Sequence, residues 1–326
     1  MPRTPRAPWM RLATIAVFWA TAMPVAAREP SVRIFYTASV KGYIDQCGCP
    51  VNPTGGIGRR ATYLHRAASA SVPTLILDGG DVLGENNDVE RLQTEYLFQA
   101  MKRLGYHTIG VGPRDLSYGL RFLQESAERY GFVFTSANLI DDATGRPVLA
   151  PYTIEEVGSR SILGSRTGRR KVGLISVMGL DRAPLVQPTD PTFRLDDPIE
   201  AVDRYVGELR GHVDLVVVMA YLDEGDVDRL LAVDGVDVVL VTRLARIPGE
   251  WVVRRGDKVV GYSTFQGRGV GHIDLTLNDA GRITRAEGDL TQLTEEYPDD
   301  PAIAQLKREF EGRKAQMLNA AGEGGK

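Results

Sequence analysis

Apolar residues along this chain follow two patterns, one typical of buried strands and the other typical of amphipathic helices. Runs rich in β-branched residues, such as 214–220 and 236–241, are apolar at nearly every position, which predicts strands buried on both faces. In 90–104, by contrast, apolar residues recur every three or four positions, which predicts a helix with one buried face. The two patterns alternate over most of the chain and favour an α/β fold.

The predicted elements up to residue 241 are short strands separated by helices. The predicted strands span 32–37, 74–77, 107–111, 132–137, 171–177, 214–220 and 236–241. The predicted helices span 59–70, 90–104, 120–130, 198–209 and 226–232. Because parallel strands need long crossover connections, this order favours parallel pairing.

The pattern changes after residue 250. Segments 251–254, 259–265 and 272–277 alternate between apolar and polar positions and are joined by glycine turns, as in antiparallel strands. Region 292–319 contains a final helix, about 301–318, whose apolar stripe packs either on its own domain or on a partner protein. Residues 320–326 are rich in glycine, and we expect them to form a disordered tail.

The first residues have the pattern of an export signal. Arg3, Arg6 and Arg11 precede a short apolar run at 12–22, and small residues follow it. This order predicts a secretory signal peptide over 1–27 and places the protein in the periplasm or outside the cell, with no transmembrane domain after cleavage. An uncleaved N-terminal anchor is the alternative.

Composition narrows the class of protein. The chain has 326 residues, of which 43% are hydrophobic and 25% charged, as expected for a soluble globular protein. Its 39 basic and 42 acidic residues leave a net charge of −3, so we expect no nucleic-acid partner.

Polar residues gather where the predicted strands end, and in α/β folds functional groups collect at such ends. Five strand-end segments stand out: 36–42, 80–81, 112–119, 220–222 and 241–245. Further motifs accompany them: GGIGRR at 55–60, LILDGGD at 75–81, LGYH at 104–107, SANL at 136–139 and GVGHIDL at 269–275.

In their order and surroundings, these segments resemble the metallophosphatase domain of the 5'-nucleotidase and UDP-sugar hydrolase group of calcineurin-like metallophosphoesterases. The resemblance covers about 32–289 and implies a four-layer αββα sandwich, with two sheets face to face and helices outside. The corresponding domain is assigned to 28–291. In this family, Asp and His side chains from the strand-end loops hold a pair of divalent metal ions.

When the family's ligand positions are compared with this sequence one by one, one metal ligand is kept. It is Asp81, which follows the second strand. The positions that supply the others carry different residues, namely Ser39, Lys41, Pro113, Arg114, Ser117, Tyr221 and 242–245. A two-metal hydrolase needs several carboxylate and imidazole ligands to hold both ions and activate a water. We therefore expect no cofactor, and a divalent metal pair only if the protein is an active enzyme.

Three of the replaced positions are now cationic: Lys41, Arg114 and Arg243. If the fold is kept, they converge beside Asp81 and could bind a small anion or phosphorylated ligand, because Arg and Lys both bind phosphate. The alternative is that these side chains form salt bridges with Asp81 and Asp115 and fill the cavity.

Cys47 and Cys49 form a Cys-x-Cys motif soon after the first strand-end loop. They could close a strained disulfide suited to exchange chemistry, or offer two thiolates to a soft metal. An inert disulfide that pins the loop is the third possibility.

Three functions follow from these residues. The first is a non-hydrolytic, anion- or partner-binding protein with a metallophosphoesterase fold, which makes the chain a pseudoenzyme. The second is an active phosphohydrolase of nucleotides or other phosphate esters. The third is a thiol redox or metal-handling accessory protein that uses Cys47 and Cys49.

Overall fold

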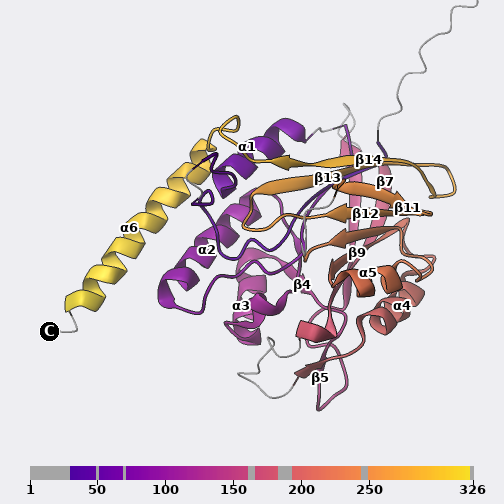
Figure 1. The fold of residues 1–326 in the computed structure, drawn as a ribbon, viewed down its shortest axis with the longest axis horizontal. Helices are drawn as coiled ribbons and strands as arrows, with labels where there is room; N and C mark the ends of the chain where they lie inside the picture. Colours follow the sequence, from indigo (N-terminus) through magenta and orange to yellow (C-terminus); the bar gives the residue numbers. More distant parts are fainter. Residues whose placement is uncertain are drawn as a thin grey trace, which may run out of the picture.

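Two sheets packed face to face, with helices on their outer sides, form the body of the protein (Figure 1). The computed structural model describes residues 30–48, 51–68, 71–160, 166–182, 193–243 and 249–323. The signal peptide predicted over 1–27 and the second cysteine of the motif, Cys49, lie outside the described residues.

The first sheet has six strands in the order β14-β13-β1-β2-β3-β4. Strands β1 to β4 run parallel, whereas β13 and β14 extend the sheet in antiparallel fashion. The bounds are β1 (Val32–Thr37), β2 (Thr74–Asp78), β3 (Thr108–Gly110), β4 (Val133–Thr135), β13 (Gly269–Leu277) and β14 (Ile283–Gln292).

The second sheet also has six strands, in the order β11-β12-β10-β9-β7-β6. Its four central strands are parallel, and an antiparallel strand closes each edge. The bounds are β6 (Tyr152–Arg160), β7 (Arg166–Met178), β9 (Leu215–Tyr221), β10 (Val238–Val241), β11 (Val252–Arg255) and β12 (Lys258–Tyr262). A separate two-stranded sheet pairs β5 (Leu139–Asp141) with β8 (Phe193–Leu195).

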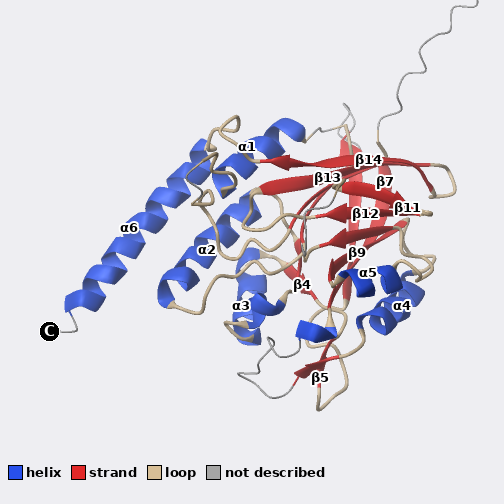
Figure 2. Cartoon of the chain, in the orientation of Figure 1, coloured by secondary structure: helices blue, strands red, loops and turns tan. Residues whose placement is uncertain are grey.

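Helices cover both outer faces (Figure 2). Four of them pack on the first sheet: α1 (Ile57–Ala67), α2 (Asp88–Arg103), α3 (Leu120–Tyr130) and α6 (Pro301–Glu323). Two pack on the second sheet, α4 (Pro198–Leu209) and α5 (Glu224–Leu230). Short 3₁₀ turns follow β3 and β7, η1 (Pro113–Leu116) and η2 (Leu180–Arg182).

Local sequence explains where several helices begin. The Asn87 side chain accepts a hydrogen bond from the Glu90 amide at the start of α2, and Asp197 caps α4 in the same way through the Ile199 and Glu200 amides. Such caps satisfy amides that have no partner within the helix.

Three apolar clusters correspond to the three interfaces between layers. One lies between the sheets and includes Ile34, Leu75 and Val217. The other two lie beneath the helices on each outer face. This arrangement confirms the four-layer αββα sandwich predicted from the resemblance.

Element bounds differ from the sequence-based ones in a few places. Strands β5, β6, β8 and β14 were not predicted. Helix α6 continues to Glu323, through part of the segment that the sequence assigned to a disordered tail. Within the part of the chain that the structure describes, no helix is long and apolar enough to span a bilayer.

Candidate functional site

Loops from both sheets meet at the ends of the parallel strands. The Ser39 amide donates to the Gly80 carbonyl (2.8 Å) and the Lys41 amide to the Asp81 carbonyl (2.9 Å), which joins the loops after β1 and β2. The Ser39 hydroxyl reaches across to the Thr242 carbonyl (3.1 Å), at the end of β10 in the other sheet. The strand-end segments singled out in the sequence therefore form one cluster.

The backbone of this cluster is strained. Of the five non-glycine residues with positive φ in the described ranges, four lie here: Ser39 (50°), Lys41 (54°), Asp81 (60°) and Gln266 (56°). Gln266 belongs to the cluster because its amide donates to the Ser39 carbonyl (2.8 Å). Such conformations are costly for residues with a side chain and concentrate at functional sites.

Glycines allow the loops after β2 and β3 to approach closely. A Cβ on Gly80, whose φ is +94°, would lie 2.7 Å from the Gly112 nitrogen, and a Cβ on Gly112 would lie 2.8 Å from the Asp81 nitrogen. Both distances are too short for real contacts, so any side chain at either position would push these loops apart.

Asp81, which the sequence assigned to a metal-ligand position of the family, is buried (2% exposed) and accepts two hydrogen bonds. Its Oδ1 accepts from the Arg114 backbone amide (2.9 Å) and its Oδ2 from the Tyr221 hydroxyl (3.2 Å). Burial, followed by the neighbouring Asp81 carboxylate, raises the pKa of Tyr221. Tyr221 is therefore a neutral donor to Asp81 near pH 7.

Asp115 holds the same loops together, through contacts that differ from those that the sequence suggested. Its buried carboxylate accepts backbone hydrogen bonds from Asp81 (2.6 Å), Val82 (2.8 Å), Leu83 (3.1 Å) and Gly112 (2.8 Å). Burial raises the pKa of Asp115 to about 7, although these amides favour the ionised form. Asp115 makes these contacts with backbone amides, whereas the sequence suggested salt bridges with the nearby cations.

Lys41 and Arg114 line the same cavity beside Asp81. This cavity has a volume of about 460 Å³, and its other lining residues are Tyr43, Glu85, Glu90, Gln93 and Gln266. The Arg114 guanidinium pairs with Glu85 (Nη1 to Oε1, 2.9 Å), whose side chain is 67% exposed. The Lys41 ammonium makes no hydrogen bond or ion pair with the described residues.

Arg243, the third predicted cation, points elsewhere. Its Nη1 lies 2.7 Å from Oδ2 of Asp181, a residue of η2 that also pairs with Arg182. Hydrogen bonds from Arg182 and Arg243 lower the pKa of Asp181. The structure therefore brings two of the three cations into one cavity and holds the third in a separate ion-pair cluster.

A buried polar chain runs beneath the site. Arg60 of α1 is fully buried, and its Nη1 donates to the Tyr106 hydroxyl (3.4 Å), while its Nε and Nη2 have no hydrogen-bond partner among the residues that the structure describes. The Tyr106 hydroxyl lies 3.0 Å from the Thr37 hydroxyl, which donates to Asp78 Oδ2 (2.6 Å). Burial raises the pKa of Asp78 to about 6, and its Oδ1 accepts from the Gly80 amide (2.9 Å). Arg60 is thus linked to the turn that follows β2.

Cys47 is buried (4% exposed), and its sulfur accepts from the Thr54 amide (3.4 Å). The surrounding loop folds back on itself through a bridge between Gln46 and Gly55. Because Cys49 lies outside the described residues, the redox and metal roles of this motif stay predictions.

The side chains at the family's ligand positions do not fit a pair of divalent ions. Asp81 supplies one carboxylate, whereas Lys41 and Arg114 are cationic and line the neighbouring cavity. Two metal ions would need several further anionic or imidazole ligands. No group of three or more His, Cys, Asp and Glu residues in the described ranges is arranged to hold a metal.

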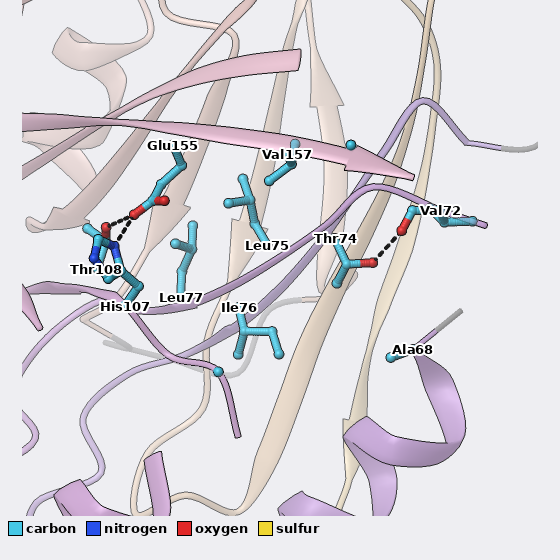
Figure 3. A pocket seen from close by; sticks show the side chains of 12 residues that line it. Ala68, Val72, Thr74, Leu75, Ile76, Leu77, His107, Thr108, Glu155 and Val157 are labelled. Atoms are coloured by element: carbon cyan, nitrogen blue, oxygen red, sulfur yellow. Dashed lines mark hydrogen bonds and ion pairs between the residues drawn. The ribbon is translucent and has the colours of Figure 1, made fainter. Parts of the chain in front are cut away.

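A second cavity, of about 510 Å³, lies near the beginning of β2 and β3 (Figure 3). Its walls are mostly apolar, and Glu155 of β6 accepts from the Thr108 hydroxyl (2.7 Å) and lies 2.5 Å from Nδ1 of His107. These contacts tie the edge of one sheet to the other. Among the described residues, its lining contains no lysine or arginine.

Comparison with known proteins gives relatives of one kind. No family model matches the chain. In sequence, the chain is 26% identical over 272 residues to the 2',3'-cyclic-nucleotide 2'-phosphodiesterase/3'-nucleotidase of Salmonella typhimurium, covering 72% of this chain and 41% of that protein. The chain thus spans less than half the length of this relative.

Two solved structures share the fold. A 5'-nucleotidase precursor from Thermus thermophilus matches with a TM-score of 0.73 and 22% identity, over 89% of this chain and 59% of that one. The calcineurin-like phosphoesterase YfkN from Bacillus subtilis matches with a TM-score of 0.73 and 16% identity, over 88% of this chain and 98% of that one.

These relatives correct one expectation. From the substituted positions we expected no cofactor. The relatives, however, are nucleotidases and phosphoesterases, a class of enzymes that depends on divalent metal ions. The expectation of no cofactor is therefore wrong, and metal dependence is what the relatives predict. In sequence and fold, the chain is similar to the 5'-nucleotidases and calcineurin-like phosphoesterases, as its motifs predicted.

Proposed function

We propose that this protein binds a phosphate ester or a similar small oxyanion through Lys41 and Arg114. The observation that carries the proposal is that both cations line one cavity beside Asp81, in the part of the chain with the most strained backbone. Among the described residues, Lys41 has no competing partner and Arg114 pairs only with an exposed glutamate, which an incoming anion can displace.

The two cations have complementary roles. The planar guanidinium of Arg114 offers parallel N–H donors that match two oxygens of a phosphate, and its backbone is held by Asp81. Lys41 supplies a compact positive charge from the neighbouring loop. Asp81 repels an anion at close range, so the ligand is expected to lie on the outer, cationic side of the cavity.

Titration calorimetry tests this proposal on the full chain, with inorganic phosphate and a phosphate monoester as probes. Replacing Lys41 or Arg114 by alanine should weaken binding roughly tenfold or more, because each change removes a charge-assisted hydrogen bond. Added salt should weaken binding by the wild type. Arg194→Ala is the matched control, because Arg194 pairs with Asp142 and Asp196 away from the cavity. Wild-type affinity in both Lys41 and Arg114 variants would contradict the proposal.

Hydrolysis of phosphate esters is the second candidate, and the names of the relatives favour it. The same purified protein should be assayed for bound metal and for turnover of a generic phosphate ester. Stoichiometric metal together with turnover, both lost in Asp81→Asn, would favour hydrolysis over simple binding.

We also propose that the protein is exported, on the strength of the N-terminal pattern over 1–27. N-terminal sequencing of the protein from its native cells should begin at Arg28. Retention of Met1 would contradict export by cleavage.

A further inference from the structure

The cavity that Lys41 and Arg114 line is also lined by two acidic side chains. Glu85 and Glu90 line it together with the two cations, so the four charged groups sum to zero. An inorganic oxyanion would compensate the charge of the two cations and leave the two carboxylates without a ligand partner. The charge pattern points instead to a ligand that carries both signs.

The acidic residues of the lining, Glu85 and Glu90, have unused hydrogen-bonding capacity. Oε2 of Glu90 accepts from the Glu85 amide, while no donor in the described ranges reaches its other oxygen. Glu85 contacts Arg114 through one oxygen. Gln93, another lining residue, donates from its amide nitrogen to the Gly42 carbonyl, which leaves its oxygen as an acceptor. Glu85, Glu90 and Gln93 therefore offer unused acceptor oxygens to a ligand.

An anion bound to Lys41 and Arg114 would leave the carboxylates in greater need of a hydrogen-bond donor or a positive charge. When a phosphate displaces Glu85 from Arg114, the released carboxylate loses its counter-charge. A cationic group on the ligand would compensate both glutamates at once. The cavity of about 460 Å³ is large enough for a small organic molecule with a charge at each end.

We propose that the ligand is a small zwitterionic phosphate monoester, with its phosphate at Lys41 and Arg114 and an ammonium group at Glu85 and Glu90. This inference rests on the proposed function, because it assumes that the cations bind the phosphate. It adds the chemical class of the ligand and assigns the two glutamates as its specificity-determining residues.

The test compares phosphoethanolamine with ethyl phosphate, which has the same two-carbon chain and lacks the ammonium group. At neutral pH the wild type should bind phosphoethanolamine roughly fivefold more tightly than ethyl phosphate, as expected for ion pairs at a partly exposed site. In Glu90→Gln and Glu85→Gln this preference should disappear, while inorganic phosphate should bind as well as or better than before. Glutamine keeps the acceptor oxygen, so both variants should fold.

Glu95→Gln is the matched control, because Glu95 lies on the same helix as Glu90 but pairs with Arg129 and does not line the cavity. It should keep the full preference. Equal affinity of the wild type for the two esters would overturn the zwitterion inference and leave the proposed function standing. A preference that survives in both glutamine variants would also overturn it. If neither ester nor inorganic phosphate binds, the proposed function fails as well.

Discussion

At Lys41 the backbone adopts a left-handed conformation, with φ of 54°, which costs a non-glycine residue about 1 kcal/mol or more. The loop keeps this conformation because the Lys41 amide bonds the Asp81 carbonyl. The strain places a cationic side chain at the edge of the cavity. A residue kept at such a cost is expected to serve binding more than stability.

Replacing Lys41 by glycine and by alanine separates these two effects. Glycine adopts positive φ at no steric cost, so Lys41→Gly should be more stable than Lys41→Ala by about 1 kcal/mol. Both variants should lose phosphate affinity equally, because both lack the ammonium group. Urea unfolding measures the first effect and calorimetry the second. Equal stability of the two variants would show that the backbone at Lys41 is not strained.

Single residues at the site were only partly predictable from sequence. The positions of Lys41, Arg114 and Asp81 follow from the rule that parallel strands end at one edge of a sheet. The ion pair between Arg243 and Asp181 was not predictable, because it depends on where η2 lies after β7. The partners of Asp115 were not predicted for a similar reason, since three of its four amide partners lie in a loop more than thirty residues away in sequence.

At the scale of elements, the strands and helices that the sequence predicted correctly are those with strong local patterns. Helices α3 and α4 have the predicted bounds, because caps and regular apolar spacing define them. Strand β14 was missed, since it has few apolar residues and is formed by its long antiparallel ladder with β13. Strand β6 likewise depends on pairing with β7. Such pairing is a tertiary effect that a local pattern does not encode.

Helix α6 combines a docked half with an exposed one. Phe310 is 1% exposed and packs against the Tyr96 ring of α2, with ring centroids 5.7 Å apart, whereas Leu318 is 53% exposed. Figure 1 shows the C-terminal half of the helix extending beyond the other helices. Packing of α6 on its own domain thus accounts for the first half of its apolar stripe, and a protein partner for the second half stays a prediction.

Truncating Phe310 tests this division. Phe310→Ala should lower the free energy of unfolding by about 3–5 kcal/mol, because it leaves a cavity in a packed interface. Leu318→Ala should change it by less than about 0.5 kcal/mol, as expected for an exposed position. Urea denaturation of the two variants provides the comparison. A large loss in Leu318→Ala would mean that the exposed half is buried in an assembly in solution.

At the scale of the whole molecule, the fold explains why the site lies where it does. Two sheets packed face to face bring the ends of β1, β2 and β3 opposite those of β9 and β10, so loops from both sheets meet at one edge. The sequence was sufficient to predict this convergence, because the strand-end motifs are local and the layer rules are general. It was not sufficient to predict that Lys41 and Arg114 line one cavity while Arg243 pairs with Asp181.

A crystal structure of the full chain soaked with tungstate, an electron-dense mimic of phosphate, tests the central claim most directly. The account predicts one oxyanion in the cavity beside Asp81, within about 3 Å of the Lys41 ammonium and of the Arg114 guanidinium. The Glu85 side chain should have moved away from Arg114 in that complex. Tungstate bound elsewhere, with neither cation in contact, would contradict the account.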